Sequence, residues 1–234
     1  MRKRFAAVRI AHGTKEVIRS VGHADTPVIV VMNHASWWDP LLGLVIAEEY
    51  FGDRPCYAPM EMEQWQNFKF MRKLGVFGVN TSDPDAFTLT KSYINGLISD
   101  NRRSVLMITP QAQFTDPRAD IRLRPGAASI AAANDEIQVI SLAVEYGFWD
   151  QQRPEVFLRA TNIDTPEIAT TAGWHRALQH GMKSNGQYLA QLVINRDSSA
   201  FVSLIGKRGA DVNPIYDAAV KLRGRSASVR SEKD

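Results

Sequence analysis

The feature that most constrains the fold is an uninterrupted apolar run, VIVVM, at residues 28–32. A run of this kind, rich in β-branched residues and without polar alternation, is typical of a strand buried on both faces. Such a strand needs helices on both sides of its sheet, which is the architecture of an α/β domain. At 234 residues the chain can build one sizeable core, so we expect a single domain.

Further strands and helices alternate along the chain, which predicts a central, largely parallel or mixed sheet flanked by helices. We expect strands at residues 54–59, 75–79, 104–108, 137–144 and 155–160. We expect helices at 2–19, 40–51, 61–74, 82–99, 126–134 and 170–194, the last broken near 184–186. The polar residues 111–122 predict a functional loop. The expected organisation is a basic amphipathic helix at 1–20, a main domain at 21–205 and a flexible basic tail at 206–234.

The composition limits the classes of function. A formal net charge of +3 is too small to indicate nucleic-acid binding. The single cysteine, Cys56, rules out an intramolecular disulfide and fits a reducing compartment. No apolar stretch of a secretory signal follows the basic N-terminus, and no apolar run reaches the roughly 20 residues of a spanning helix. We therefore expect a cytoplasmic protein that is attached peripherally to the inner face of a membrane.

Polar residues follow the buried strand directly, in the segment NHASWWD at 33–39. Ligands of open α/β sheets bind at the carboxyl ends of strands, so we expect a site here. Asp39 before Pro40 has the pattern of a helix N-cap. Its carboxylate could equally orient the ring of His34, because an imidazole held by a carboxylate is a common general base. The sequence allows both roles at once.

No nucleophile accompanies His34 and Asp39. There is no G-x-S-x-G segment, and we interpret Cys56 as a small core residue. A base without a protein nucleophile indicates direct transfer to a hydroxyl of the substrate itself. No cluster predicts a metal site, since His175 and His180 are five residues apart and lack the i, i+4 spacing of helical metal ligands.

Four sequence blocks resemble the motifs of the glycerolipid acyltransferase family, in the family's order. Residues 33–39 match its NHxxxxD motif, and residues 74–80, 107–113 and 139–144 stand where its other three motifs stand. The resemblance covers residues 21–145 and extends loosely to 205. It implies the α/β fold of that family and the transfer of a fatty acyl group to a hydroxyl of a lipid-like acceptor. The implied donor is acyl-CoA or an acyl-carrier protein, acting as a co-substrate, and no cofactor is implied.

The resemblance also assigns roles to residues. It implies that His34 is the general base and that Asp39 orients it. It implies substrate binding by residues of the first three blocks: Asn33, Ser36, Trp37, Gly75, Asn80, Thr109, Pro110, Gln111 and Gln113. Backbone amides near the third block are expected to stabilise the oxyanion.

Three departures from the family pattern bear on the acceptor. Members that accept a phosphate-bearing lipid have arginine where this chain has Thr81 and Phe114, and glutamate where it has Gln111. Arginine suits bidentate phosphate binding, and neither replacement can do the same. We therefore expect an acceptor that is not a phosphomonoester. The sequence is similar to a bacterial subgroup that acylates glycosylated carotenoids, which makes a neutral glycolipid plausible. Three arginines either replace the missing charges or form a solvated basic loop: Arg118, Arg122 and Arg124.

Two segments, 1–19 and 61–74, combine apolar and basic residues at helical spacing. In the second, Trp65, Phe68, Met71 and Leu74 accompany Lys69, Arg72 and Lys73. One interpretation is a helix packed on the core. The other is a helix on a membrane surface, with its basic residues toward the headgroups.

The altered third block leaves a second hypothesis about function open. A protein of this fold without activity could bind lipid or a partner protein, and Gln111 with Ala112 favours that possibility. The intact pair of His34 and Asp39 favours an enzyme. Hydrolysis of the thioester by water would need an open polar site rather than the two tryptophans of the first block.

Overall fold

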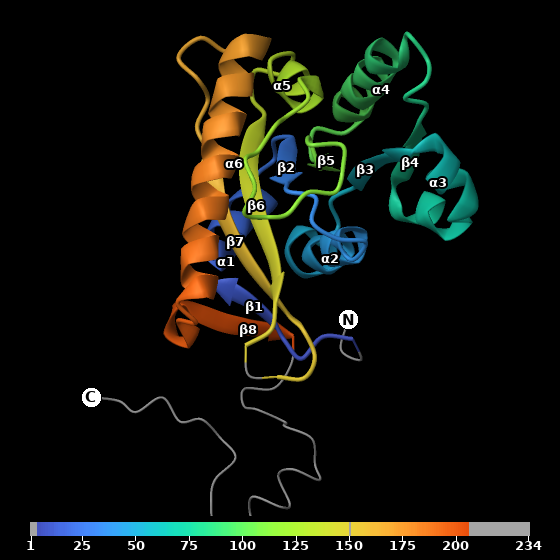
Figure 1. Ribbon diagram of the computed structural model, residues 1–234. Helices are drawn as coiled ribbons and strands as arrows, with labels where there is room; N and C mark the ends of the chain where they lie inside the picture. The colour runs from blue at the N-terminus through green and yellow to red at the C-terminus, as the bar shows by residue number, and fades with distance from the viewer. Residues whose placement is uncertain (1–3, 150, 206–234) are drawn as a thin grey trace, which may run out of the picture.

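The computed structural model describes residues 4–149 and 151–205 (Figure 1). In this part of the chain an eight-stranded sheet has the order β4-β3-β5-β2-β6-β7-β1-β8. The strands are β1 (Val8–Ala11), β2 (Val28–Met32), β3 (Cys56–Glu61), β4 (Val76–Val79), β5 (Val105–Ile108), β6 (Gln138–Gly147), β7 (Glu155–Ile163) and β8 (Phe201–Ile205). The strands from β4 to β6 in this order are parallel, β7 and β1 run the opposite way, and β8 is antiparallel to β1. The predicted α/β fold with a mixed, mostly parallel sheet is confirmed.

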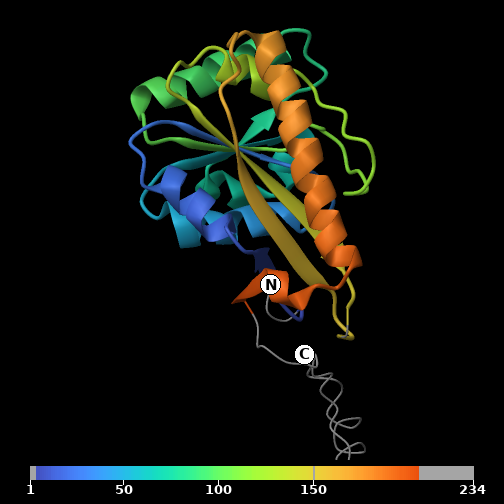
Figure 2. The same cartoon turned by 90° about the vertical axis from the view of Figure 1, so that its left-hand side faces the viewer.

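Helices cover both faces of the sheet. They are α1 (Thr14–Gly22), α2 (Asp39–Ile46), α3 (Met62–Asn67), α4 (Ala86–Asp100), α5 (Gly126–Ala131) and α6 (Thr171–Ile194). A π-helical turn, η1 (Ala47–Phe51), continues α2, and there are two 3-10 turns, η2 (Lys69–Leu74) and η3 (Ser198–Ala200). Figure 2 shows α1 on one side of the strands and α4, α5 and α6 on the other. Figure 1 shows α6 along β6 and β7, and α3 beside β4 at the far edge of the sheet.

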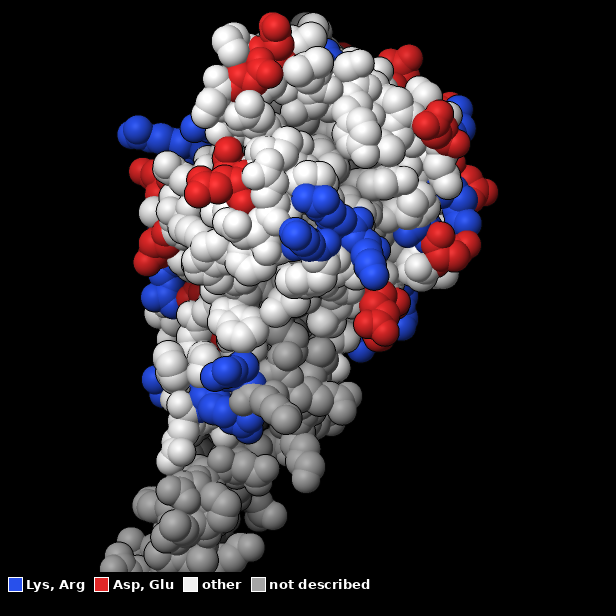
Figure 3. Space-filling model, turned by 90° about the vertical axis from the view of Figure 1, so that its right-hand side faces the viewer, with Lys and Arg blue, Asp and Glu red and all other residues white. Residues whose placement is uncertain are grey.

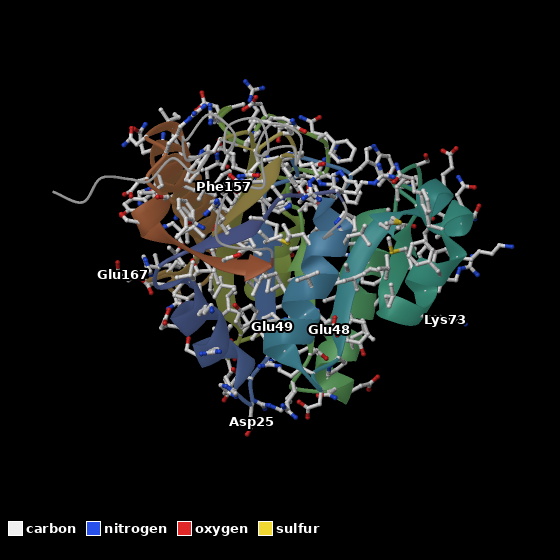
Figure 4. All side chains as sticks on the ribbon, turned by 90° about the horizontal axis from the view of Figure 1, so that it is seen from below. Asp25, Glu48, Glu49, Lys73, Phe157 and Glu167 are labelled. Atoms are coloured by element: carbon white, nitrogen blue, oxygen red, sulfur yellow. The ribbon has the colours of Figure 1, made fainter. Side chains whose placement is uncertain are left out.

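Strand β2 shows why the sheet needs both layers. Val28, Val30 and Met32 pack into a cluster with side chains of α1 and α2, whereas Ile29 and Val31 pack with α4, α5 and α6. All five side chains are at most 3% exposed. Full burial of one such side chain stabilises the fold by about 1.5–3 kcal/mol. With helices on one face alone, the side chains on the other face of β2 would stay exposed to water and would not contribute this stabilisation. A third cluster, around Phe157 of β7, lies toward α6 (Figure 4).

The N-terminal segment differs from the predicted helix at residues 2–19. Strand β1 lies between β7 and β8, and α1 begins only at Thr14, after Gly13 with a φ of 81°. The apolar residues that suggested an exposed amphipathic face are in the core, with Phe5 4% and Val8 1% exposed. Pairing on both edges of β1 outweighs the helical spacing of these residues, which is a weak local preference. The predicted tail at 206–234 lies outside the described residues.

Three other elements differ from expectation, while the remaining predicted strands and helices are confirmed with ends shifted by a few residues. The helix expected at 61–74 is divided into α3 and η2 at Phe68. Helix α6 is continuous through the expected break, because buried Asn185 donates to the carbonyl oxygens of Ser141 and Arg159, both at 3.0 Å. Strand β8 was not expected; it forms by pairing with β1.

A buried arginine holds the end of α1 and the segments before β2 and β5 in place. The guanidinium of Arg54, only 3% exposed, donates hydrogen bonds to five backbone carbonyls: Val21, Gly22, Ala24, Thr26 and Arg103. These carbonyls lie at the end of α1, in the approach to β2 and in the approach to β5, so Arg54 fixes both strands that carry the site. Within the described residues, no helix is both long enough and apolar enough to cross a membrane.

Candidate active site

The segments singled out in the sequence meet at one edge of the sheet. Strands β2, β5, β3 and β4 are parallel, so their carboxyl ends lie on the same side. β2 and β5 are neighbours, which brings His34 close to the residues that follow β5. β5 and β3 separate β2 from β4, so Asn80 is displaced from the end of β2 by about 14 Å along this edge, at about 4.8 Å per strand.

Asn33 fixes the turn that leaves β2. Its Nδ2 donates to the carbonyl of Val144 at 2.8 Å, and its Oδ1 accepts from the amide of Val144 at 2.7 Å. The side chain thus prolongs the pairing of β2 with β6 by one step, and it is buried. Both polar groups of Asn33 bond to β6, so its role in this structure is to hold the turn, and substrate binding by Asn33 stays a prediction.

His34 and Asp39 are in contact. Nδ1 of His34 lies 2.8 Å from Oδ2 of Asp39, and the two side chains are 22% and 2% exposed. A hydrogen bond to this carboxylate requires the proton on Nδ1, which leaves the lone pair on Nε2. A ring that is held by a buried carboxylate and still reached by solvent can take a proton from a bound hydroxyl.

Asp39 does not cap α2. The N-cap residue is Trp38, and no side chain makes a cap hydrogen bond there. Oδ2 of Asp39 instead accepts from the amides of Ala35 and Ser36, both at 2.9 Å, and so closes the turn between β2 and α2. Oδ1 accepts from the hydroxyl of Tyr146 at 2.6 Å. The expected double role of Asp39 is therefore replaced by another: it orients His34 and it shapes the loop that carries it.

The third block holds the backbone of His34. Oε1 of Gln111 accepts from the amide of His34 at 2.8 Å, and Nε2 of Gln111 donates to the hydroxyl of Thr115. The amide of Thr115 in turn donates to the carbonyl of His34 at 2.8 Å. Gln111 is buried, 6% exposed. Its amide oxygen and its amide nitrogen each make one of these hydrogen bonds, so Gln111 supports the backbone of His34, and contact with substrate stays a prediction.

Ala112, next to Gln111, has a φ of 55°. This is the left-handed region, which costs a residue with a Cβ roughly 1–2 kcal/mol. The neighbouring contacts of Gln111 and Thr115 hold the turn in place, and the strain is local to it.

An aromatic wall stands beside His34. The ring centre of Phe114 lies 4.2 Å from that of the imidazole, and the ring centre of Trp37 lies 5.5 Å from that of Phe114. The series continues through Phe68, 6.3 Å from Trp37, to Phe70, 6.4 Å further. All four aromatic residues of this wall are exposed, Trp37 by 57% and Phe70 by 53%. The wall joins the predicted site residue Trp37 to the segment at 61–74.

The second block contributes in two different ways. Gly75 has a φ of 78°, and a Cβ there would lie 2.0 Å from the carbonyl oxygen of Cys56, so its role is to let η2 turn into β4. Asn80 lines a cavity of about 420 Å³ between α3, β4 and α4. The cavity walls are mainly apolar and aromatic, with Trp65, Phe77 and Tyr93 among them.

Four further predicted residues lie on the loops at this edge. Ser36 accepts at Oγ from the amide of Trp38 at 3.2 Å. The carbonyls of Thr109 and Pro110 accept from the amides of Ala112, at 3.0 Å, and Arg124, at 2.8 Å, and so shape the loop after β5. Gln113 is exposed. All four stay candidates for contacts with substrate.

The structure bears on two groups outside the predicted site, Arg118 and Cys56. Arg118 pairs with the buried carboxylate of Glu145 on β6, so its charge has a partner although its own side chain is 49% exposed. Burial raises the pKa of Glu145, which Arg118 opposes. Burial likewise raises the pKa of the Cys56 thiol to about 11, so it is not a thiolate nucleophile at neutral pH. Among the described residues, no group of His, Cys, Asp and Glu is arranged to hold a metal ion.

The sequence profile of one protein family, described as Acyltransferase, matches residues 9–145. The match spans more than half of the chain and includes every residue of the site described above except Tyr146. The chain belongs to the acyltransferase family. No curated protein matches it. The family match begins inside β1, which agrees with the place of that strand in the sheet rather than in a separate N-terminal helix.

Two supports of this candidate site were missed by sequence reasoning. Tyr146 is 107 residues from Asp39 and no local pattern marks it. Thr115 contacts both Gln111 and the backbone of His34 from a loop without a periodic signal. The one available clue was the position of Tyr146 near the end of a predicted strand, a place where α/β sheets carry ligands.

Proposed function

We propose that this protein transfers a fatty acyl group from a thioester, acyl-CoA or acyl-carrier protein, to a hydroxyl of a lipid-like acceptor. Nε2 of His34 takes the proton of the acceptor hydroxyl while its oxygen attacks the thioester carbonyl. The C–S bond then breaks, and the imidazolium returns the proton to the departing thiolate. The observation that carries the proposal is the contact of 2.8 Å between His34 and the buried Asp39, in a chain of the acyltransferase family.

The surroundings of His34 support a neutral acceptor. Phe114 lies against the imidazole, and Thr81 donates to the carboxylate of Glu61 at 2.9 Å. Position 114 thus offers an aromatic ring, and position 81 lies beside the negative charge of Glu61. Neither attracts a phosphate dianion. Arg118, committed to Glu145, supplies no substitute. An uncharged headgroup, such as the sugar of a glycolipid, suits Trp37 and Phe114 better.

The cavity beside β4 supports a long-chain substrate. Its volume of about 420 Å³ lies in the range of small-molecule sites, and its aromatic and aliphatic lining favours an alkyl chain. Asn80, Asp83 and Thr90 supply the few polar groups at its wall.

Contact with a bilayer through residues 61–74 is part of the proposal. Phe68, Phe70 and Leu74 are 39%, 53% and 38% exposed, close to three cations, Lys69, Arg72 and Lys73. Figure 3 shows Lys and Arg side chains grouped amid uncharged surface on the side where α3 lies, and Figure 4 shows Lys73 at that outer end of the protein. Exposed aromatics beside cations suit anionic headgroups. The segment at 1–19 is withdrawn from this role, because the apolar side chains of its described residues, 4–19, lie in the core or are partly buried.

The test of the reaction is a panel of substrates with product detection by mass spectrometry. Palmitoyl-CoA and palmitoyl-acyl-carrier protein serve as donors, and dodecyl glucoside, a monoacylglycerol and lysophosphatidate as acceptors. We expect esters of the neutral acceptors, little ester of lysophosphatidate, and a loss of at least 10³-fold in His34→Ala. Near-normal turnover by a folded His34→Ala protein would overturn the mechanism, and rapid acylation of lysophosphatidate would overturn the acceptor class.

The test of membrane contact is co-sedimentation with vesicles of phosphatidylcholine and phosphatidylglycerol. We expect binding that weakens with salt and that falls in Phe70→Ser and in Lys73→Gln, with Lys183→Gln on α6 as the matched control. Equal recovery in the supernatant with and without vesicles would contradict it.

The alternative, a protein of this fold without activity, predicts binding of these lipids and no ester with either donor. Gln111 no longer favours that alternative as it did in the sequence. Its side chain holds the backbone of His34, a role that an amide performs well.

A further inference from the structure

The carboxylate of Asp39 is held from two sides. Oδ2 accepts three hydrogen bonds, from Nδ1 of His34 and from the amides of Ala35 and Ser36, at 2.8–2.9 Å. Oδ1 faces the other way and accepts from the hydroxyl of Tyr146 at 2.6 Å. The three donors to Oδ2 come from the loop that carries the histidine, whereas Tyr146 comes from β6 in the sheet. Tyr146 therefore links the carboxylate, and through it the imidazole, to the rigid part of the fold.

We infer that Tyr146 is a positioning residue of this site, which acts through Asp39 to set the orientation and the proton uptake of His34. The proposed function enters this inference only where rates of acyl transfer are measured. The effect on His34 itself does not depend on which substrates the protein uses.

Tyr146 is a fixed donor. Its ring contacts Phe5 at 5.8 Å, and Phe5 contacts Trp38 at 5.1 Å, so the side chain is held by packing. Burial, followed by the nearby charge of Asp39, raises the pKa of Tyr146 well above its usual value. The hydroxyl is therefore protonated throughout the pH range of an assay. Among the described residues, the other titratable groups nearby are His34 itself and Glu145, which precedes Tyr146 on β6, points to the opposite face and pairs with Arg118.

The direction of the effect follows from the charge on Asp39. A hydrogen bond from Tyr146 spreads that charge and weakens the attraction of the carboxylate for a proton on His34. Without the hydroxyl, the carboxylate holds the imidazolium more strongly, and His34 loses its proton only at higher pH. Oδ2 keeps its three donors and stays beside Nδ1, while the loss of the donor to Oδ1 loosens the orientation of the carboxylate relative to β6.

The experiment compares Tyr146→Phe with a matched control, Tyr50→Phe. Tyr50 is buried in the cluster against which the partly buried Tyr146 packs, and it has a hydroxyl without a hydrogen-bond partner in the described structure. In Tyr146→Phe we expect kcat with palmitoyl-CoA and dodecyl glucoside to fall by about tenfold with KM little changed. We expect the rising limb of the pH–rate profile to move up by about half a unit to one unit. Tyr50→Phe should leave both unchanged.

A second readout needs no substrate. Titration of ring-labelled histidine by NMR, with the His34 signal assigned by its loss in His34→Gln, should show the same upward shift of its midpoint in Tyr146→Phe. Replacement of Tyr146 by 3,5-difluorotyrosine, a stronger donor of the same shape, should move the midpoint of the His34 titration downward. This variant provides the test if Tyr146→Phe does not fold. Superimposable His34 titrations in all variants would overturn the inference. A shifted titration in a protein without acyl transfer would uphold it while refuting the proposed function.

Discussion

Replacement of Asp39 by asparagine removes one charge from the site and leaves the volume of the side chain almost unchanged. The amide oxygen of asparagine can still accept from the amides of Ala35 and Ser36, and its NH₂ group can donate to the oxygen of Tyr146. The loop between β2 and α2 should therefore keep its shape. What is lost is the attraction between a carboxylate and the imidazolium that forms when His34 takes up a proton.

The size of this loss can be worked from the geometry. With Nδ1 and Oδ2 2.8 Å apart, the centres of the two charges are separated by about 4 Å, which corresponds to about 4 kcal/mol at an effective dielectric constant of about 20. At 1.36 kcal/mol for each factor of ten, kcat should fall by about 10³-fold. The known cost of the same change in a Ser-His-Asp triad is about 10⁴-fold, which is of similar size.

The assay is the release of CoA from palmitoyl-CoA in the presence of dodecyl glucoside, with urea unfolding measured in parallel. Asp197→Asn is the control, because Asp197 is a partly exposed carboxylate that also accepts from a backbone amide, that of Ser199 at 3.1 Å. Asp39→Asn should lose activity, while the urea concentration at its unfolding midpoint should stay close to that of the parent protein. A folded Asp39→Asn protein that retains more than a tenth of the parent kcat would refute the electrostatic role of Asp39.

Three further predictions concern specificity and stability. Phe114→Arg should raise the rate of acylation of lysophosphatidate relative to that of dodecyl glucoside by about tenfold, because a guanidinium beside His34 can bind phosphate. The control Phe114→Leu lacks the charge and should not raise this ratio of rates. The same ratio in both variants would count against the assigned acceptor class. Arg54→Met should lower the free energy of unfolding by about 3 kcal/mol, read from urea midpoints, because carbonyls that it satisfies become buried without donors. A loss below 1 kcal/mol would show that water replaces the guanidinium. Ala112→Gly should raise the melting temperature by about 2–4 °C by relieving a φ of 55°, and a lower melting temperature would contradict strain at this turn.

The elements with strong local patterns were predictable, and those that depend on distant partners were not. Val28–Met32 is continuous, β-branched and buried on both faces, so its sequence identifies it. Phe5, Val8 and Ala11 recur at the spacing of a helix face. The segment Val8–Ala11 nevertheless forms a strand, because β7 and β8 pair with it on either side. The polar stretch around Asn185 suggested a break in α6, but its side chain finds acceptors on β6 and β7 and the helix continues.

The candidate site divides in the same way. The sequence by itself determined His34 and Asp39 as a pair, since five residues and one tight turn are enough to bring the two side chains together. It also determined that the chain is an α/β protein, because a doubly buried strand requires it. Only the tertiary structure decided that Asn33 and Gln111 serve the backbone, that Gly75 serves a turn, and that Tyr146 holds Asp39. These roles arise from contacts between residues about 80 to 110 positions apart or from a close backbone approach, and hydrogen-bond partners at that separation are set by strand order rather than by local sequence.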